Sequence, residues 1–537
     1  MSKANKLFKQ GKYYESLEVY DAVLKTDPKH SIAWYGKGKV LIKLKKYHGA
    51  LQASEMSLKS DPNNTDAWNN NGVILEELGK YEDALEAYDN ALELDSKYVN
   101  PLHNKGNIFI KLEKYNEALE VYDDVLKIDP KRVSAWISKG VVLNKLGKYE
   151  DALEAYDNAL KIDRNIMDAW NNRGNLLVKF GRHPEALESY DKVLEIYFRG
   201  VKNHRFSKDM EIDMKPTKTL YNKAHVLIVL GKYQEALTCY NNLLELDPQN
   251  INARCRKGLI LEELGKNQEA LTCYNEVLEI DPKNFKAWFS KGHMLSKLGK
   301  HQEALKCHEK SLELDPKYFD AWLGKSIVYK VLEMPIEEIE CYEKALELDP
   351  NIDAIWLNKG NALGIIGKYQ EAIICFDKVL QSDSTNETAY FYKGFALSCL
   401  KRYEESLKCF KKVLKINSNS VEAWYNIGHV LANMGKYQEA LESYENVLER
   451  DKNHAGAWHN LGYVLNDLKM HQKALKSFEK SIEINPSCVD GWYGKGFSLE
   501  KIGNFQEALV CYGKVLELDP DFEAAKKAKS DLLLKIN

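Results

Sequence analysis

The chain has 537 residues, and its 76 lysines and arginines against 79 aspartates and glutamates give a formal net charge of −3. This balance excludes a global electrostatic attraction to nucleic acid or to an anionic membrane. The longest aliphatic run, Val226 to Leu230, is far too short to cross a bilayer. The first residues lack the apolar segment and cleavage site of a signal peptide, so we expect a soluble cytoplasmic protein.

A pattern of 34 residues recurs along almost the whole chain. In residues 65–98, repeat positions 4, 8, 15, 20 and 24 are occupied by Trp68, Gly72, Gly79, Ala84 and Tyr88. Apolar residues on both sides of position 15 recur at intervals of three and four, which places them on one face of a helix. Each repeat is therefore predicted to be two helices joined by a tight turn. Two short helices cannot enclose a core, so each repeat needs its neighbours.

In chain order, the first repeat lacks its first four positions, and fourteen complete repeats follow it. They begin at residues 31, 65, 99, 133, 167, 217, 251, 285, 319, 353, 387, 421, 455 and 489. We predict an array of six repeats in residues 1–197, an inserted loop or helix extension in 198–216, nine repeats in 217–522 and a capping helix in 523–537. A surface extension is the favoured interpretation of the insert, and a hinge or docking loop is the alternative.

These repeat positions resemble the signature of the tetratricopeptide repeat. All ten tryptophans occupy position 4, twelve of the fifteen repeats have Gly at position 8, and nine of the thirteen prolines occupy position 32. The resemblance covers everything except the insert and the last fifteen residues. It implies an all-α, right-handed superhelical α-solenoid of about fifteen helix-turn-helix repeats with a C-terminal capping helix. The resemblance is to a prokaryotic-type array, and we expect no attached catalytic domain.

No motif for catalysis is found in the sequence. GxGxxG, GxSxG and HExxH motifs do not occur. None of the ten cysteines has CxxC spacing, and seven of them share position 23, so they are interpreted as apolar fillers rather than as disulfides or metal ligands. We predict that the protein is not an enzyme and uses neither a cofactor nor a metal ion.

Position 7 departs from the family pattern, which has Leu there. Eleven of the fourteen complete repeats carry Lys or Arg at this position. The favoured interpretation is that each stem covers apolar surface while the charge reaches water. The alternative is a basic stripe that binds nucleic acid.

The first helix of each tetratricopeptide repeat lines a concave groove, and the resemblance implies that positions 2, 5, 6, 9, 12 and 13 point into it. Asparagine recurs at positions 6 and 9 of this helix: Asn70, Asn104, Asn107, Asn172, Asn175, Asn222, Asn358, Asn361, Asn426 and Asn460. Each amide offers two donors and one acceptor to a peptide backbone. A similar asparagine ladder occurs in O-GlcNAc transferases. The alternative is that Asn is only a tolerated solvated residue, but its weak helix propensity argues against chance recurrence.

Aromatic residues enter the predicted groove toward the C-terminus: Phe391, Tyr392, Phe395, Tyr425, Tyr463, Tyr493 and Phe497. They are predicted to anchor an apolar partner segment. We therefore predict a noncatalytic protein-protein interaction scaffold that binds peptides or other proteins, with no nucleic acid, membrane or small-molecule substrate. The alternatives are a targeting or regulatory subunit for a separate modifying enzyme such as a glycosyltransferase, and an RNA-binding solenoid. The oligomeric state is left open.

Overall fold

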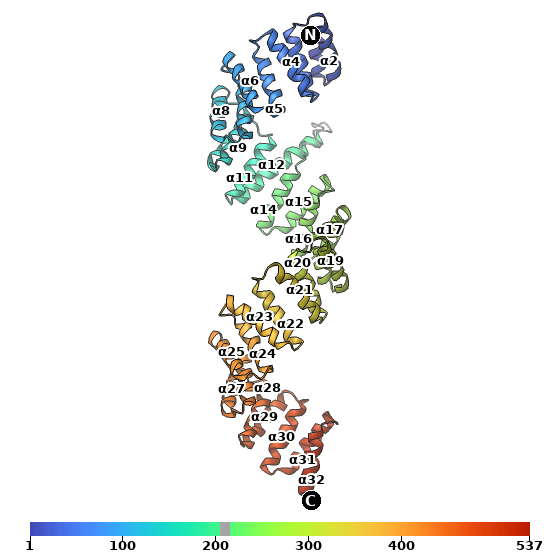
Figure 1. The fold of residues 1–537 in the computed structure, drawn as a ribbon, viewed down its shortest axis with the longest axis vertical. Coiled ribbons are helices and arrows are strands. Elements are labelled where there is room, and N and C mark those ends of the chain that lie inside the picture. The colour runs from blue at the N-terminus through green and yellow to red at the C-terminus, as the bar shows by residue number, and fades with distance from the viewer. Residues whose placement is uncertain (204–214, 537) are drawn as a thin grey trace. The chain divides into compact units, whose positions relative to one another are not determined.

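The computed structural model describes residues 1–203 and 215–536, and every regular element in these ranges is an α-helix. The chain divides into two compact units, Met1–Leu264 and Gly265–Asn537. In each unit, pairs of helices follow one another in chain order (Figure 1). Each unit is thus an all-α repeat solenoid, as the 34-residue period predicts. The handedness of the superhelix stays a prediction.

The N-terminal unit contains fifteen of the described helices. They are α1 (Ser2–Lys9), α2 (Tyr13–Thr26), α3 (Ser31–Lys43), α4 (Tyr47–Ser60), α5 (Thr65–Glu77), α6 (Tyr81–Leu94), α7 (Val99–Lys111), α8 (Tyr115–Ile128), α9 (Val133–Lys145), α10 (Tyr149–Ile162), α11 (Met167–Lys179), α12 (His183–Lys202), α14 (Thr217–Val229), α15 (Tyr233–Leu246) and α16 (Ile251–Glu263).

The C-terminal unit contains sixteen of them. They are α17 (Asn267–Ile280), α18 (Phe285–Lys297), α19 (His301–Leu314), α20 (Phe319–Val331), α21 (Pro335–Leu348), α22 (Asp353–Ile365), α23 (Tyr369–Ser382), α24 (Glu387–Cys399), α25 (Tyr403–Ile416), α26 (Val421–Asn433), α27 (Tyr437–Arg450), α28 (Ala455–Asp467), α29 (His471–Ile484), α30 (Val489–Ile502), α31 (Phe505–Leu518) and α32 (Glu523–Ile536).

The turn between the two helices of a repeat has a left-handed residue at position 15. Ten repeats place Gly there, for example Gly79 with φ of 75°. Five repeats place Lys or Glu there instead, for example Glu113 with φ of 59°. Glycine suits this position because it adopts positive φ without the steric cost that a side chain adds.

The core of a repeat is built around the aromatic ring at position 24, which the repeat that begins at 31 replaces with Ser54. In the repeat that begins at 455, this ring is Phe478, which is fully buried. A Cβ added at Gly462, position 8 of the same repeat, would lie 2.7 Å from Cζ of Phe478. A Cβ added at Gly494, position 6 of the next repeat, would collide with the same ring. These two glycines thus let the first helices of both repeats close on one ring.

The tryptophans at position 4 fasten each repeat to the end of the preceding one. All ten indole N–H groups donate to the backbone carbonyl six residues earlier, at 2.8–3.4 Å. Trp68, for example, donates to the carbonyl of Pro62 at 2.8 Å. The rings are half-buried. This bond fixes the first helix against the turn where the previous second helix ends.

The two segments outside the repeats were predicted as an insert and a capping helix. Helix α12 continues to Lys202, so the start of the insert extends that helix. Residues 204–214, on which the predicted hinge or docking loop depends, lie outside the described residues, so these predicted boundaries stay predictions. Helix α32 occupies the predicted capping segment and buries Ala525 and Leu532, but Leu534 near its end is 78% exposed. That end of the helix is therefore apolar on its surface.

All ten cysteines are free thiols in the structure. The seven at position 23 are buried, and burial raises the pKa of the Cys375 thiol to about 11. Within residues 1–203 and 215–536, no group of three or more His, Cys, Asp or Glu side chains is arranged to hold a metal ion.

Candidate functional site

The predicted groove positions form one surface of each unit. We call it the A face: the side chains at positions 2, 5, 6, 9, 12 and 13 of the first helix of each repeat. First helices of successive repeats contact one another directly, as α5 contacts α7 and α24 contacts α26. The A face therefore runs from one repeat to the next within each unit.

The three predicted asparagines at position 9, Asn107, Asn175 and Asn361, lie half-buried on the A face. Two of them accept a hydrogen bond from the tyrosine at position 24 of the same repeat. Tyr122 donates to Asn107 at 2.6 Å, and Tyr190 donates to Asn175 at 2.8 Å. These amide oxygens therefore satisfy nearly buried phenols inside the array, a role that the sequence-based hypothesis of backbone binding does not include.

The seven asparagines at position 6 are also half-buried, and four of them donate within the array. These bonds are Asn104 to Asn69 Oδ1 at 3.3 Å, Asn222 to Asn175 Oδ1 at 2.8 Å, Asn426 to the Glu422 carbonyl at 2.8 Å and Asn460 to Tyr425 Oη at 3.0 Å. Three of the bonds cross from one repeat to the preceding one. Part of the recurrence of Asn is thus explained by bonds between neighbouring first helices.

Four of the predicted aromatic anchors pack against their own unit. Tyr425 lies 5.9 Å from Tyr444, Tyr463 lies 5.2 Å from Phe478, and Tyr493 lies 5.7 Å from Tyr512, measured between ring centroids. The Phe497 ring is covered by the ammonium group of Lys501, at 5.0 Å from its centroid. All four are only half-exposed. Their contribution to a partner is therefore limited to the edges that remain open.

The other three aromatic residues meet at a pocket of about 300 Å³ between α22, α24 and α26. It brings together five of the residues predicted from the sequence: Asn361, Phe391, Tyr392, Phe395 and Asn426. Its floor is formed by the buried ring of Phe376, which stacks on Tyr392 with the centroids 6.1 Å apart. We call this cavity the aromatic pocket.

Sequence reasoning missed several residues that line the aromatic pocket. They are Gly360, Gly364, Ile365, Tyr369, Phe376 and Ala396. Ile365 is the residue that sequence reasoning could have found, because it is an aliphatic residue at position 13, a predicted groove position. Its side chain is 69% exposed.

The rim of the aromatic pocket belongs to a strip of exposed apolar side chains. Phe395 is 48% exposed, and Ile327 and Val331 on α20 are 53% and 54% exposed. The A-face positions of α22 and α24 carry no charged residue. Exposed apolar side chains that lie together on one face mark interaction sites in soluble proteins.

Comparisons with known families decide the identity of the fold. Models described as tetratricopeptide repeats match residues 1–64, 65–98, 133–166, 168–197, 217–283, 285–318, 319–352, 341–374, 419–487 and 489–522, and one described as a TPR repeat matches 106–147. The chain is a tetratricopeptide repeat protein. A further model, described as subunit 3 of the anaphase-promoting complex or cyclosome, matches residues 366–447. This repeat architecture is that of a protein-interaction scaffold.

Solved structures of other repeat proteins are similar to this tetratricopeptide array. A crystal structure of MamA is 24% identical, with 31% of this chain and 92% of that chain covered and a TM-score of 0.30. YrrB, described as a TPR protein with an unusual peptide-binding site, is 26% identical over 36% and 99% of the two chains, with a TM-score of 0.32. The Cut9–Hcn1 structure is 16% identical over 92% and 95%, with a TM-score of 0.36. No curated protein sequence matches the chain.

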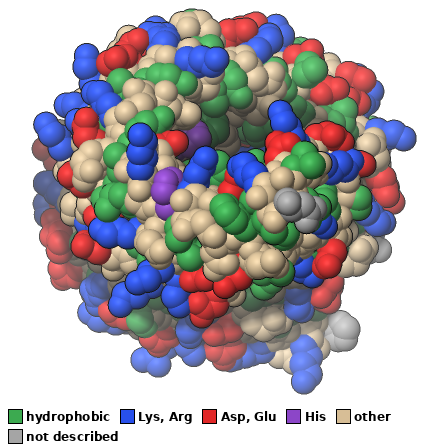
Figure 2. Space-filling model, turned by 90° about the horizontal axis from the view of Figure 1, so that it is seen from below, with side chains coloured by type: hydrophobic (Ala, Val, Ile, Leu, Met, Phe, Trp, Pro, Cys, Tyr) green, Lys and Arg blue, Asp and Glu red, His purple; other side chains and the backbone are tan. Residues whose placement is uncertain are grey.

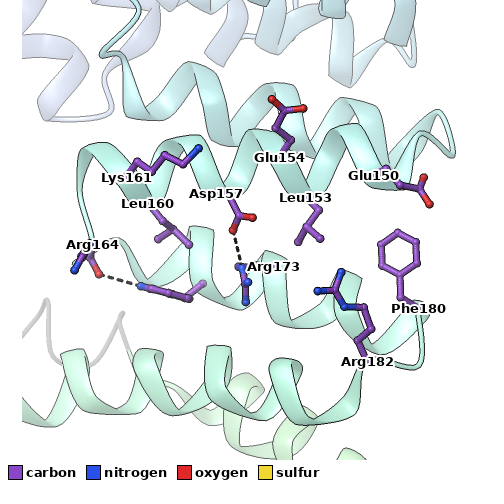
Figure 3. Close-up of a pocket in the computed structure, with 11 residues that line it drawn as sticks. Glu150, Leu153, Glu154, Asp157, Leu160, Lys161, Arg164, Arg173, Phe180 and Arg182 are labelled. Atoms are coloured by element: carbon purple, nitrogen blue, oxygen red, sulfur yellow. Dashed lines mark hydrogen bonds and ion pairs between the residues drawn. The ribbon is translucent and has the colours of Figure 1, made fainter.

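The basic residues at position 7 of the tetratricopeptide repeats cover Trp rings at position 4, as interpreted from the sequence, but most of their charges are paired with carboxylates rather than left in water. Nine of them form ion pairs with Asp or Glu at position 25 of the preceding repeat. Arg173 Nε lies 2.7 Å from Asp157 Oδ1 (Figure 3). Its guanidinium lies 5.7 Å from the Trp170 ring. The nine basic side chains are only 15–24% exposed. They join successive repeats and form no free basic stripe.

A larger pocket of about 650 Å³ lies over the Arg173–Asp157 pair in the N-terminal unit, between α10, α11 and the start of α12 (Figure 3). Its lining mixes acidic residues such as Glu150 and Glu154 with basic residues such as Lys161 and Arg182. Similar pockets recur over Trp136 and Trp458, so the feature follows from repeat stacking. Figure 2 likewise shows acidic and basic side chains interspersed over the face that it draws.

No helix in the described part of the chain combines the length and the hydropathy needed to span a membrane.

Proposed function

We propose that this protein is a noncatalytic scaffold that binds a segment of a partner protein on the A face, with the aromatic pocket holding an apolar side chain of that segment. The proposal is supported mainly by the exposure of Ile365 and Phe395, 69% and 48%, at the rim of a pocket of about 300 Å³. Exposed apolar side chains around a preformed cavity are typical of the anchoring positions of interfaces.

Asparagine amides are placed to hold the backbone of the bound segment. Asn361 and Asn426 line the aromatic pocket beside its aromatic residues. Asn426 uses one amide hydrogen on the Glu422 carbonyl, so its Oδ1 remains to accept from a backbone N–H. The other predicted asparagines, such as Asn172 and Asn358, extend this polar lining along the A face of both units.

The affinity of one such pocket is modest. Burying one Leu, Ile or Phe side chain contributes about 1.5–3 kcal/mol, while association costs at least about 4 kcal/mol in lost freedom of motion. Stable binding therefore requires that several repeats of the A face contact the same segment.

Cys399 provides a test, because it is the exposed member of the ten cysteines and its A-face position borders the aromatic pocket. A hydrogen bond with Cys399 raises the pKa of Tyr369, a residue of the pocket lining. The full chain is labelled at Cys399 with a benzophenone maleimide, mixed with lysate from its source cells and illuminated. Cross-linked proteins are then identified by mass spectrometry.

We expect one or a few proteins to cross-link through a single short segment, and Phe395→Asp to reduce their yield at least tenfold. Ile336→Asp is the matched control, because Ile336 on the second helix α21 is 62% exposed and lies outside the A face. Equal yields from Phe395→Asp and Ile336→Asp would show that the aromatic pocket takes no part in binding.

A further inference from the structure

Two exposed charges lie on either side of the aromatic pocket, at positions 12 and 13 of the first helices α20 and α28. Lys330, at position 12 of α20, is exposed and lies on the N-terminal side. Asp467, at position 13 of α28, is exposed and lies on the C-terminal side. Within the residues that the structure describes, neither residue makes an ion pair, although Lys330 lies near enough to the buried Glu338 carboxyl to favour its charged form. Along positions 12 and 13, two exposed charges of opposite sign therefore flank uncharged residues, while Asp320 and Glu422 are exposed at position 2 of their helices.

The residues between these charges lie along one edge of the A face, at positions 12 and 13 of successive first helices. In order, this edge reads Lys330-Val331, Gly364-Ile365, Ser398-Cys399, Ala432-Asn433 and Asn466-Asp467. The order is thus basic, apolar, neutral and acidic. We call these five pairs the recognition edge.

The length of the recognition edge sets the length of its occupant. Packed helices lie about 8–10 Å apart, so the four intervals from α20 to α28 span about 32–40 Å. An extended chain covers about 3.3–3.6 Å per residue, so about ten to twelve residues reach from Lys330 to Asp467.

We propose that the C-terminal unit recognises an extended segment of about ten to twelve residues, with an acidic residue over α20, an apolar residue in the aromatic pocket and a basic residue over α28. This inference rests on the proposed function and adds the charge order of the partner. The uncharged pocket rejects a charged residue at the centre, because the buried charge would find no counter-ion among Phe391, Phe395 and Ile365. The two end charges fix the direction in which the segment runs.

The two flanking charges determine the direction in which the segment binds more than they determine its affinity. An exposed ion pair changes an affinity only about two- to fivefold, whereas a reversed segment would place like charges together at both ends. The charge order of selected ligands is therefore a more sensitive readout than the affinity of any single ligand.

The test is selection of a phage-displayed library of random 16-residue peptides on the immobilised full chain. We expect an enriched consensus with Asp or Glu, then an aromatic or aliphatic residue, then Lys or Arg, together with binding that weakens as salt increases. The Lys330→Glu, Asp467→Lys double variant should enrich the opposite charge order. The same charge order from both proteins, or no consensus from the wild type, would overturn the proposal.

A second variant separates this inference from the proposed function. The Ile365→Asp, Phe395→Asp double variant changes only exposed side chains, and its circular dichroism spectrum is to be compared with that of the wild type to check that it folds. If this variant loses the consensus while the charge-swapped variant keeps the wild-type charge order, the pocket binds the segment but the flanking charges do not set its direction. Enrichment of the same peptides by the pocket variant would refute the pocket itself. A consensus that matches a segment of this chain would identify a second copy as the occupant and would also overturn the proposal.

Discussion

Gly360→Ala is expected to lower the free energy of unfolding by about 1–3 kcal/mol through overpacking, while Gly364→Ala, one turn later in α22, is expected to raise it by about 1 kcal/mol through helix propensity. A Cβ at Gly360 would lie 2.6 Å from Cε1 of Phe376 and 3.1 Å from Cβ of Cys375. A Cβ at Gly364 would meet no atom within 4 Å. The two substitutions are chemically identical, so they isolate the contact with the position-24 ring.

Urea unfolding followed by circular dichroism measures the two midpoints, and hydrogen exchange of peptides from α22 and α23 shows whether the change is local. Local readout is needed because the stability of a repeat array is approximately a sum over repeats and their interfaces. Equal midpoints for the two variants would show that position 8 does not close on the ring as the structure indicates.

His308→Phe is expected to stabilise the protein by about 1–3 kcal/mol at pH 7, because it removes two buried nitrogens that lack hydrogen-bond partners. His308 takes the place of the position-24 ring and is completely buried. Its ring lies where a Cβ at either Gly292 or Gly324 would come within 2.8 Å. Phe376 and Phe410 occupy the equivalent position in later repeats, so a phenyl ring fits this packing.

The stabilising effect of His308→Phe should grow as the pH falls. Burial, followed by the charges of His293 and Lys325, lowers the pKa of His308 from 6.5 to about 4. Below pH 6.5 the unfolded chain therefore binds a proton that the folded chain does not, and wild-type stability is lost until the pH reaches about 4. At pH 5 this difference adds about 2 kcal/mol to the advantage of the variant.

Urea midpoints of the wild type and the variant at pH 7 and pH 5 test this expectation. His429→Phe is the control, because it removes an exposed histidine of the same unit and should change stability by less than about 0.5 kcal/mol. A gap between wild type and His308→Phe that stays constant from pH 7 to pH 5 would contradict the assignment of His308 as a buried neutral group.

The sequence predicted most of the fold because each repeat position faces the same surroundings in every repeat. Position 4 places an indole next to the preceding turn, and position 24 places a ring between two first helices. These roles require the same type of residue once every 34 residues, as Trp68, Gly72 and Tyr88 illustrate for one repeat. The left-handed residue at position 15 was predicted as a turn for the same reason.

Contacts between repeats were harder to predict, because spacing within one repeat does not show which positions of its neighbour lie opposite. The ion pair of Arg173 with Asp157 joins position 7 to position 25 of the preceding repeat. Acidic residues recur at position 25, so this pairing left a signal, but only the offset between repeats shows that the two positions meet. The same limit applies to Asn104, whose partner Asn69 belongs to the preceding first helix.

Only part of the lining of the aromatic pocket was predicted from the sequence, for a similar reason. Phe391, Tyr392 and Phe395 stand on one helix and were found from its pattern. Gly364 and Ile365 stand on the preceding first helix, and they contribute to the pocket only because α22 and α24 pack together. A cavity forms where neighbouring side chains leave space unfilled, and the sequence pattern does not show directly where that space lies.

We expect a partner to bind the A face rather than the surface of the second helices. The most direct test is the affinity of a peptide selected on the wild type for Ile365→Asp and for Ile374→Asp, measured by isothermal titration calorimetry. Both isoleucines belong to the same repeat and are 69% and 53% exposed, but Ile374 lies on the second helix α23. We predict that Ile365→Asp weakens binding at least tenfold and that Ile374→Asp leaves it unchanged. The reverse order, or equal affinities, would contradict the account.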